Sequence, residues 1–279
     1  MTPASPSQPA TLAIQGRRFS IDLGRAHDLA IALDFDGRQP RWFTAPLACS
    51  TPLASGSFRG RVGSGSSCNC STLALTPHCD GTHTECAGHL TVERLDARAV
   101  APSAFVAALL VTVTPTRADQ GDEGTRPAPR ADDLLITRHA LEKAWPASLP
   151  FAPRALVVRT LPNPAAKRVR DYLAQPPAFL SLPAATLLVE RGVEHLVLDV
   201  PSADRADDSG LLSAHREFFG LPAGSASLAA VRRPQCTITE LAFIDATVPD
   251  GAYLLSLQVP ALGGDAVPSR PLLYSVREA

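Results

Sequence analysis

The sequence has no apolar run that approaches the roughly 18 residues of a membrane-spanning helix. It also has no excess of charge of one sign, because 26 basic residues are balanced by 27 acidic ones. The first absence argues against a protein embedded in a bilayer. The second argues against a basic surface for nucleic acid or for a membrane. Aromatic residues make up only 5% of the chain, so they do not identify a substrate. The expected partners are therefore small molecules or other proteins.

The first residues lack the features of a secretory signal. Residues 1–10, MTPASPSQPA, contain neither a positively charged segment nor an apolar one. We therefore expect a cytoplasmic protein whose six cysteines are reduced. The Pro, Ser and Ala residues at this end predict a disordered tail over residues 1–15. Residues 16–279 show no break in composition and are long enough to form one domain with a sizeable core.

Apolar periodicity predicts an α/β fold in which strands dominate. Alternating or largely apolar segments predict strands at residues 19–24, 29–35, 71–77, 104–115, 154–160 and 194–202. Helices are expected after Thr137, an N-cap candidate, and over residues 181–193. Ser181 is the expected N-cap of the second helix, and Gly192 ends it. The order strand, helix, strand over 154–202 is typical of a crossover unit with parallel strands.

Three further segments carry weaker signals. The Gly/Ser-rich stretch 50–67 predicts a loop or a hairpin, and the polar stretch 116–133 predicts an exposed loop. Residues 237–262 predict two strands joined through the turn signal Pro-Asp-Gly.

The most informative segment is HCDGTHTECAGHL, residues 78–90, which holds three histidines, two cysteines and two acids in thirteen positions. Imidazole and thiolate suit zinc, whereas carboxylates favour harder ions such as manganese. Cys79, His83, Glu85 and His89 can converge on one point in either an extended or a helical segment. Gly81 permits a tight turn between them. The pattern therefore predicts a metal site.

Two other interpretations of this segment remain open. Its histidines can be ordinary surface residues beside buried free cysteines, although three of the chain's seven histidines then cluster without a reason. Alternatively, Cys68 and Cys70 can join Cys79 and Cys86 in a structural four-cysteine zinc site. Such sites more often separate paired cysteines by two or more residues, which disfavours that arrangement.

The stretch GTHTECAGH, residues 81–89, resembles the signature HxGTHxDxPxH of the cyclase family of metal-dependent hydrolases. This family includes bacterial kynurenine formamidases and isatin hydrolases. Further segments resemble the family in the same order along the chain, namely residues 19–35, 181–204, 213–220 and 237–262. The resemblance implies a swivelling β/β/α fold with a β-barrel-like core, which assembles as dimers or higher oligomers. It also implies that one or two zinc or manganese ions activate a water that opens an amide, formamide or lactam bond.

The resemblance assigns roles to individual residues. His83 corresponds to a metal ligand, and Glu85 takes the place of an aspartate ligand that can bridge two metals. His89 corresponds to the general acid/base. His215 and Glu240 correspond to the distal pair that completes a second metal site or its surroundings.

Three departures from the signature leave the metal site open to alternatives. Cys79 stands at the first histidine position with His78 one residue earlier, Glu85 replaces aspartate, and Ala87 replaces proline. The longer acid moves the carboxylate outward by about 1.5 Å, one C–C bond. A Cys79 thiolate can bind zinc, a bulge can bring His78 in instead, or the site can be weakened or lost. The corresponding functions are a metal-dependent amidohydrolase, an arylformamidase acting on N-formylkynurenine, or a non-catalytic family member.

Other candidate residues have structural alternatives. Asp199 and Ser202 follow the strand predicted at 194–202, where α/β sheets place ligands, so they can contact substrate or merely cap a turn. His215 alone reads equally well as an exposed helix residue. Glu240 needs a partner if it is buried, which can be a metal or a nearby arginine, Arg232 or Arg233.

Overall fold

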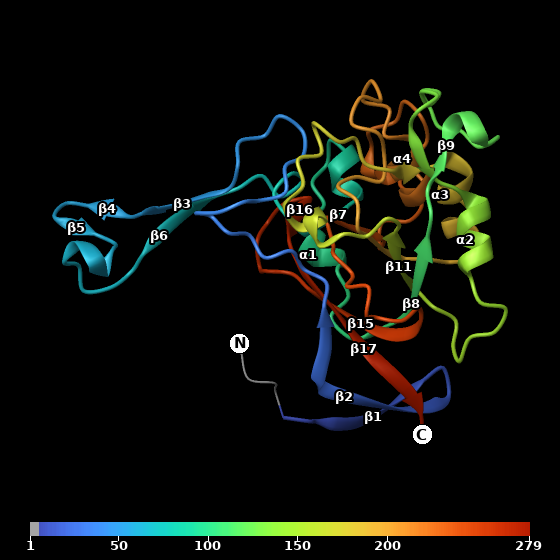
Figure 1. Cartoon of the computed structure of the whole chain (residues 1–279), viewed down its shortest axis with the longest axis horizontal. Coiled ribbons are helices and arrows are strands. Elements are labelled where there is room, and N and C mark those ends of the chain that lie inside the picture. Colours follow the sequence, from blue (N-terminus) through green and yellow to red (C-terminus); the bar gives the residue numbers. More distant parts are fainter. Residues whose placement is uncertain (1–5) are drawn as a thin grey trace.

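The computed structural model describes residues 6–279 and is built on a ten-stranded mixed sheet (Figure 1). The strand order is β1-β2-β17-β15-β8-β11-β13-β14-β7-β16. The strands are β1 Pro9–Ile14, β2 Arg17–Asp28, β7 His83–Cys86, β8 Val106–Val113, β11 Ala155–Thr160, β13 His195–Leu198, β14 Thr237–Glu240, β15 Gly251–Gln258, β16 Ala266–Pro268 and β17 Arg270–Glu278. The expected α/β class and single domain are thus observed as one mixed sheet with helices.

The central strands β8, β11, β13 and β14 run parallel, and β15 and β7 flank them antiparallel. Every residue of β11 and β13 is buried, as expected for strands covered on both faces. The strands predicted at 104–115, 154–160 and 194–202 are confirmed in shortened form. The parallel crossover predicted between the last two is also confirmed.

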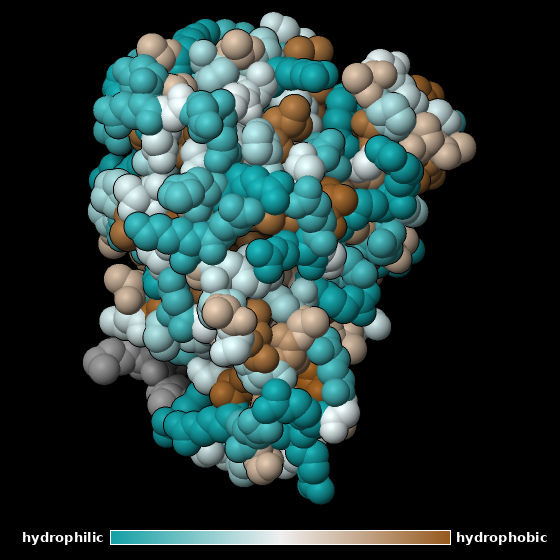
Figure 2. Space-filling view, turned by 90° about the vertical axis from the view of Figure 1, so that its right-hand side faces the viewer, coloured by the Kyte–Doolittle hydropathy of each residue, from teal (hydrophilic) through white to brown (hydrophobic). Residues whose placement is uncertain are grey.

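The helices are α1 Ala97–Val100, α2 Arg138–Ala144, α3 Leu182–Glu190 and α4 Ser213–Phe219. Both predicted N-caps form, because Thr137 Oγ1 accepts from Ala140 N at 3.1 Å and Ser181 Oγ from Ala184 N at 3.0 Å. Helix α3 packs against α2 and α4. The face of the molecule over these helices is mainly hydrophilic, with scattered apolar residues (Figure 2), because their apolar sides are turned toward the sheet. No helix within residues 6–279 is long and apolar enough to cross a membrane.

A separate arm projects from the body of the molecule (Figure 1). It consists of β3 Cys49–Pro52 paired with β6 Ser71–Ala74, and β4 Ala54–Ser55 paired with β5 Phe58–Arg59. The hairpin predicted over 50–67 is therefore confirmed. A small three-stranded sheet of β9 Thr116–Arg117, β10 Leu134–Ile136 and β12 Phe179–Leu180 borders the stretch predicted as an exposed loop.

The prediction of a strand at 29–35 is wrong. Only Ala30 forms an isolated bridge, with Ala242. The backbone groups of this segment bind several elements instead of one strand: Leu29 N donates to Pro271 O and Ile31 N to Thr82 Oγ1. Apolar residues alternate here because Leu29 and Ile31 are buried, although the segment that carries them is irregular.

The prediction of a disordered tail over 1–15 is also wrong for residues 9–14, which form β1. Its Leu12 and Ile14 are half-buried while alternate residues are exposed, and β1 pairs antiparallel with β2. Residues 1–5 lie outside the described part of the chain. In the C-terminal segment, β14 and β15 form as predicted, but they are not neighbours, because β13, β11 and β8 lie between them in the sheet.

Candidate metal centre

The candidate site is formed where β7, β14 and α4 meet. Strands β7 and β14 pair antiparallel, with His83 opposite Glu240 and Glu85 opposite Ile238, and all residues of both strands are buried. His83 and Glu85 are two residues apart in a strand and therefore point to the same face. His215 reaches this face from α4. The exposed helix histidine considered as an alternative is not observed, because His215 is only 1% exposed.

The turn before β7 is set by two residues of the signature. Gly81 has a φ of +77°, and a Cβ there would lie 2.9 Å from Leu33 Cδ2, so both backbone and space favour glycine. The next residue, Thr82, fixes the turn with its hydroxyl. Its Oγ1 donates to Leu241 O at 2.5 Å and accepts from Ile31 N at 2.8 Å. The turn thereby delivers His83 into the buried face.

The potential ligand atoms form three overlapping groups, of which one is His78, His89 and Asp265 and the other two share Glu85. Of these two, one is His78, His83 and Glu85, and the other is Glu85, His215 and Glu240; in each group the ligand atoms lie within 4.8 Å of one another. His215 Nε2 lies 2.8 Å from Glu85 Oε1 and 3.5 Å from Glu240 Oε1. The structure thus brings together five of the residues that the sequence pointed to.

Each of the three histidines has one ring nitrogen bound away from the centre. His83 Nδ1 contacts Gly81 O at 3.1 Å, His215 Nδ1 contacts Asp204 Oδ2 at 2.7 Å, and His78 Nε2 contacts Asp265 Oδ2 at 2.8 Å. The opposite ring nitrogen of each then faces the shared carboxylates. Metal-ligating histidines are typically held in this way by carbonyl or carboxylate groups.

The charges of the centre are mutually stabilised. Burial alone would raise the pKa of Glu85, but His215, His89 and His78 hold that pKa well below its usual range. Burial and the charge of Glu85 work against ionisation of Glu240, yet His215 and His83 keep its pKa below its ordinary value. In turn, the pKa of His215 is well above its ordinary value, because Glu85 and Asp204 outweigh the effect of burial. The carboxylates are therefore ionised at neutral pH.

Two buried atoms of the centre have no hydrogen-bond partner, His83 Nε2 and Glu85 Oε1. Both approach neighbours closely, His83 Nε2 being 3.4 Å from Glu240 Oε2, but the geometry is not that of a hydrogen bond. Buried polar atoms without partners are rare and costly. Imidazole nitrogens and carboxylate oxygens are ligands for zinc and manganese. The residues present therefore fit a divalent cation.

His78, and not Cys79, belongs to these groups. The chain turns at this point, because Cys79 N and Asp80 N both donate to Thr76 O at 2.9 Å. As a result the Cys79 side chain packs with Trp42, Tyr172 and Leu241. Burial raises the pKa of its thiol to about 11. The His78 ring instead places Nδ1 2.9 Å from Glu85 Oε2.

The four-cysteine arrangement is not observed. Cys68 and Cys70 are exposed on the arm, whereas Cys79 and Cys86 are buried in separate apolar clusters. Within residues 6–279 no group of potential metal ligands includes a cysteine. The arginine partners considered for Glu240 are not observed either, because its side chain meets His215, His83 and Ala203 N.

His89 lies at the edge of the centre on a 3₁₀ turn, Ala87–Leu90, with its side chain 27% exposed. Its ring stacks on His78, with ring centroids 4.2 Å apart, and its Nδ1 is 3.4 Å from Asp265 Oδ2. The sequence reasoning did not select Asp265 or Asp204. Asp204 also accepts from His215 N at 3.0 Å.

Asp199 and Ser202 have different surroundings. Asp199 is buried away from the cavity and accepts from Lys167 Nζ at 2.7 Å and from Thr160 N at 2.8 Å. Ser202 lines the cavity that opens onto the centre. Its hydroxyl also accepts from Asp204 N at 3.2 Å, as expected for a residue that caps a turn.

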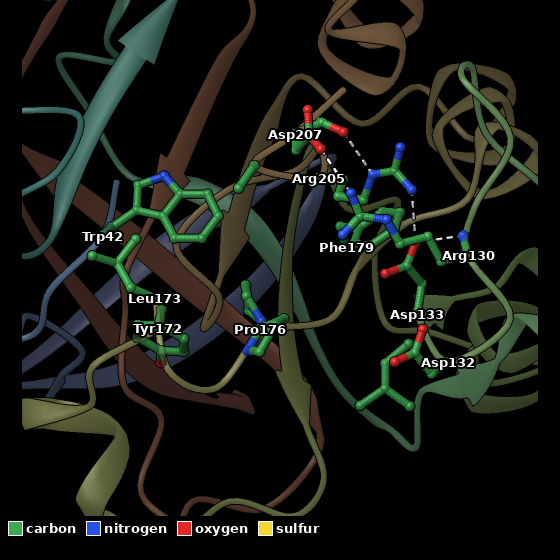
Figure 3. A pocket seen from close by; sticks show the side chains of 13 residues that line it. Trp42, Arg130, Asp132, Asp133, Tyr172, Leu173, Pro176, Phe179, Arg205 and Asp207 are labelled. Carbon is green, nitrogen blue, oxygen red and sulfur yellow. Dashed lines mark hydrogen bonds and ion pairs between the residues drawn. The ribbon is translucent and has the colours of Figure 1, made fainter. Parts of the chain in front are cut away.

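The cavity over the centre has a volume of about 330 Å³ and is bordered by His89, Trp42 and Phe43. A second cavity of about 300 Å³ adjoins it and shares Trp42 and Arg205 (Figure 3). The second cavity is lined by both apolar and charged residues, and four of its five charged residues are paired. These pairs are Arg205 with Asp133, at 2.9 Å, and Arg130 with Asp207, at 2.7 Å.

Comparisons with known proteins give the family of this chain and support its fold. A family model described as "Putative cyclase" matches residues 27–205, more than half of the chain. A solved potential metal-dependent hydrolase with cyclase activity gives a TM-score of 0.55 at 17% identity, over 90% of this chain and 98% of its own. A predicted metal-dependent hydrolase from Bacillus stearothermophilus gives 0.54 at 17%, over 90% and 98%.

A third solved structure is isatin hydrolase A from Labrenzia aggregata, bound to benzyl benzoate. It gives a TM-score of 0.54 at 12% identity, over 91% of this chain and 94% of its own. At these identities the three likenesses establish a shared fold. A comparison with curated proteins finds no match.

Proposed function

This chain belongs to the cyclase family, and from that premise we propose that it is a metal-dependent hydrolase. The proposed reaction opens an amide, formamide or lactam C–N bond of a small molecule. One observation carries the proposal: two overlapping ligand groups meet at Glu85, and two of their buried atoms have no hydrogen-bond partner. The complete set of ligands disfavours the alternative of a non-catalytic family member.

In this proposal His78, His83 and Glu85 hold one ion. Glu85, His215 and Glu240 hold a second ion or support the first. The mixed nitrogen and oxygen donors favour zinc and also permit manganese. A bound divalent cation polarises the scissile carbonyl and lowers the pKa of the attacking water. The anchored rings of the histidines keep their free nitrogens in place for this purpose.

His89 is the proposed general acid/base. It borders the cavity, it is partly exposed, and its Nδ1 lies toward Asp265, which leaves Nε2 to exchange a proton with the substrate. A proton delivered to the departing nitrogen would allow the C–N bond to break. Cys79 also lines the cavity, but it is not assigned as a ligand, because its thiol packs in an apolar cluster and its pKa is raised.

The rest of the substrate would lie against Trp42 and Phe43, with Ser202 at the polar side of the cavity. The solved isatin hydrolase supports hydrolysis of a small molecule on this fold. Asp199 is not included, since its carboxylate is already bound to Lys167 and Thr160. We retain as parts of the proposal the swivelling β/β/α architecture with a barrel-like core, a cytoplasmic location and a homodimer. Light scattering tests the last of these.

The decisive variant is His89→Ala, with His139→Ala as the matched control because His139 is an exposed histidine on α2. We expect His89→Ala to retain its metal and to lose about 10²- to 10⁴-fold in turnover on amide and lactam substrates. His139→Ala should match the wild type in both. Metal content is measured by elemental analysis. Retention of both metal and full turnover in His89→Ala would show the assignment of His89 to be wrong.

A parallel assay separates the proposed reaction from its closest alternative. N-formylkynurenine is offered beside lactams and simple anilides. Hydrolysis confined to N-formylkynurenine would identify an arylformamidase. Failure of the zinc- or manganese-loaded wild type on every C–N bond offered would refute the proposed hydrolase.

A further inference from the structure

Asp265 reaches the centre from the opposite end of the sequence. It directly precedes the edge strand β16, which pairs antiparallel with β7 and places Ala266 opposite Glu85. The backbone confirms this position, because Asp265 O accepts from Cys86 N at 3.0 Å. The pairing therefore holds the Asp265 side chain beside the cluster of histidines.

A single carboxylate oxygen of Asp265 faces two histidine rings. Its Oδ2 lies 2.8 Å from His78 Nε2 and 3.4 Å from His89 Nδ1. The two rings lie one over the other at 4.2 Å, with 33° between their planes. One acceptor thus sits between the ring of a proposed ligand and the ring of the proposed acid/base.

We propose that Asp265 is the positioning residue for both His78 and His89. It accepts the Nε2–H of His78, so that Nδ1 of the same ring faces Glu85 at 2.9 Å. It accepts from Nδ1 of His89 and leaves Nε2 of that ring toward the cavity. The part that concerns His89 rests on the proposed function, whereas the part that concerns His78 rests on the geometry alone.

This role explains how the chain does without a histidine at position 79. His83 and His215 are anchored by groups close to them in sequence, Gly81 and Asp204. His78 lies one residue before the usual ligand position, on a turn, and has no such local acceptor. Its anchor comes instead from Asp265, 187 residues away.

The carboxylate of Asp265 is not needed to hold its own loop. Gly264 N donates to Asp96 Oδ1 at 3.0 Å, and Gly264 O accepts from Ala97 N at 2.8 Å. The side chain of Asp265 is 41% exposed, and its recorded partners are the two histidines. Removing it should therefore leave the fold intact while releasing the rings.

The first test measures zinc affinity of the full chain by competition with a chromophoric chelator. We expect Asp265→Ala to weaken zinc binding about 10- to 100-fold, the usual effect of losing a group that orients a ligand. Asp265→Asn keeps an acceptor oxygen and should lose less. Asp28→Ala is the matched control, because Asp28 is 42% exposed, pairs with Arg270 and belongs to none of the ligand groups. Wild-type zinc affinity in Asp265→Ala would overturn the inference.

The second test does not depend on activity, and its comparison of variants needs no zinc. Nitrogen-15 NMR should detect a slowly exchanging Nε2–H signal that is absent in His78→Gln and therefore belongs to His78. Asp265→Ala should abolish the slow exchange, and Asp28→Ala should preserve it. An unchanged signal in Asp265→Ala would overturn the inference. The inference would also be overturned if His78 Nε2 carried no proton in the zinc-loaded wild type, because Asp265 and His78 would then bind a metal together.

These readouts separate the inference from the proposed function. A wild type that binds zinc but hydrolyses no C–N bond refutes the hydrolase and leaves the anchoring of His78 supported by affinity and NMR. In an active enzyme, Asp265→Ala at saturating zinc should lower kcat about 10-fold or more with little change in KM. A merely structural loss would instead reduce the fraction of active protein and leave the His78 signal unchanged.

Discussion

Two buried charged clusters lie at the ends of the adjacent parallel strands β13 and β14. We call the first complete, because its buried side-chain atoms all have hydrogen-bond partners, and the second incomplete, because two of its atoms have none. After β13, Asp199 binds Lys167 Nζ at 2.7 Å, and Lys167 Nζ also donates to Thr160 O at 2.8 Å. At the end of β14, Glu240 meets Glu85 and histidines whose buried atoms are in part without hydrogen-bond partners. Burial of charge is common to both, so it does not identify a functional site. What distinguishes the second cluster is that buried atoms without hydrogen-bond partners lie among several potential metal ligands.

The pKa values show the same contrast. In the complete cluster burial dominates, raising the pKa of Asp199 and lowering that of Lys167 despite their attraction. In the incomplete one the histidines outweigh burial and keep the pKa of Glu85 low. In the first cluster Lys167 already supplies the cation that pairs with Asp199. The second cluster is a set of ionised acids and imidazoles that can bind a cation.

The largest expected effect comes from breaking the complete pair. Lys167→Met leaves Asp199 buried without its cation, which should lower the free energy of unfolding by about 3–5 kcal/mol. Zinc bound per chain should not change. Urea unfolding at pH 7 measures the loss. Arg17→Met, in the exposed pair with Glu278, is the control and should cost less than about 1 kcal/mol. Equal costs for the two variants would remove the contrast between the clusters.

Adding zinc to the incomplete cluster should raise the free energy of unfolding by an amount comparable to the loss expected for Lys167→Met. At a zinc concentration about 1,000 times Kd, the wild type should gain about 4 kcal/mol of stability over the chelator-treated protein. Glu240→Gln should lose most of this gain, because it replaces the carboxylate of a proposed ligand. In chelator, Glu240→Gln should itself lower stability, because the attraction of His215 and His83 for the Glu240 carboxylate outweighs its repulsion from Glu85. Thermal unfolding with and without zinc measures both. Identical Tm values in zinc and chelator would refute the assignment.

A third effect contrasts two buried histidines. Burial lowers the pKa of His195 to about 4, although its Nδ1 contacts Thr237 Oγ1 at 3.0 Å. Because the unfolded state then binds the extra proton between pH 6.5 and 4, stability is complete above that window and falls as pH drops through it. The loss attributable to His195 is about 3 kcal/mol by pH 4. His195→Asn should lack this part of the acid dependence. Parallel stability curves for variant and wild type over pH 4–7 would contradict it.

Local signals in the sequence account for much of the fold. The strand at 104–115 and the caps at Thr137 and Ser181 depend on neighbouring residues, and they form as predicted. Alternation at 29–35 was misleading, because burial on one side does not require a partner strand. The backbone of that segment binds three separate elements instead.

Some residues of the site could likewise be predicted from neighbouring residues, whereas others depend on contacts between distant parts of the chain. The cluster at 78–90 is visible as a motif, and His215 and Glu240 follow from the resemblance to a family. Asp265 carries no local signal, because its role depends on β16 pairing with β7. The choice between His78 and Cys79 depended on a turn at Thr76 that spacing alone does not reveal.

The smallest expected effect concerns that choice. Cys79→Ser should leave zinc affinity within about threefold of the wild type, because the thiol packs on Trp42 and Leu241 outside the ligand groups. It should cost only about 1–3 kcal/mol in stability, from burying a hydroxyl. His78→Ala, its neighbour, should weaken zinc binding much more. Cobalt substitution gives an independent measurement, since a thiolate ligand produces a charge-transfer band near the ultraviolet. A band of this kind that disappears in Cys79→Ser would make the thiolate the ligand, and would transfer to Cys79 the place that the geometry gives to His78.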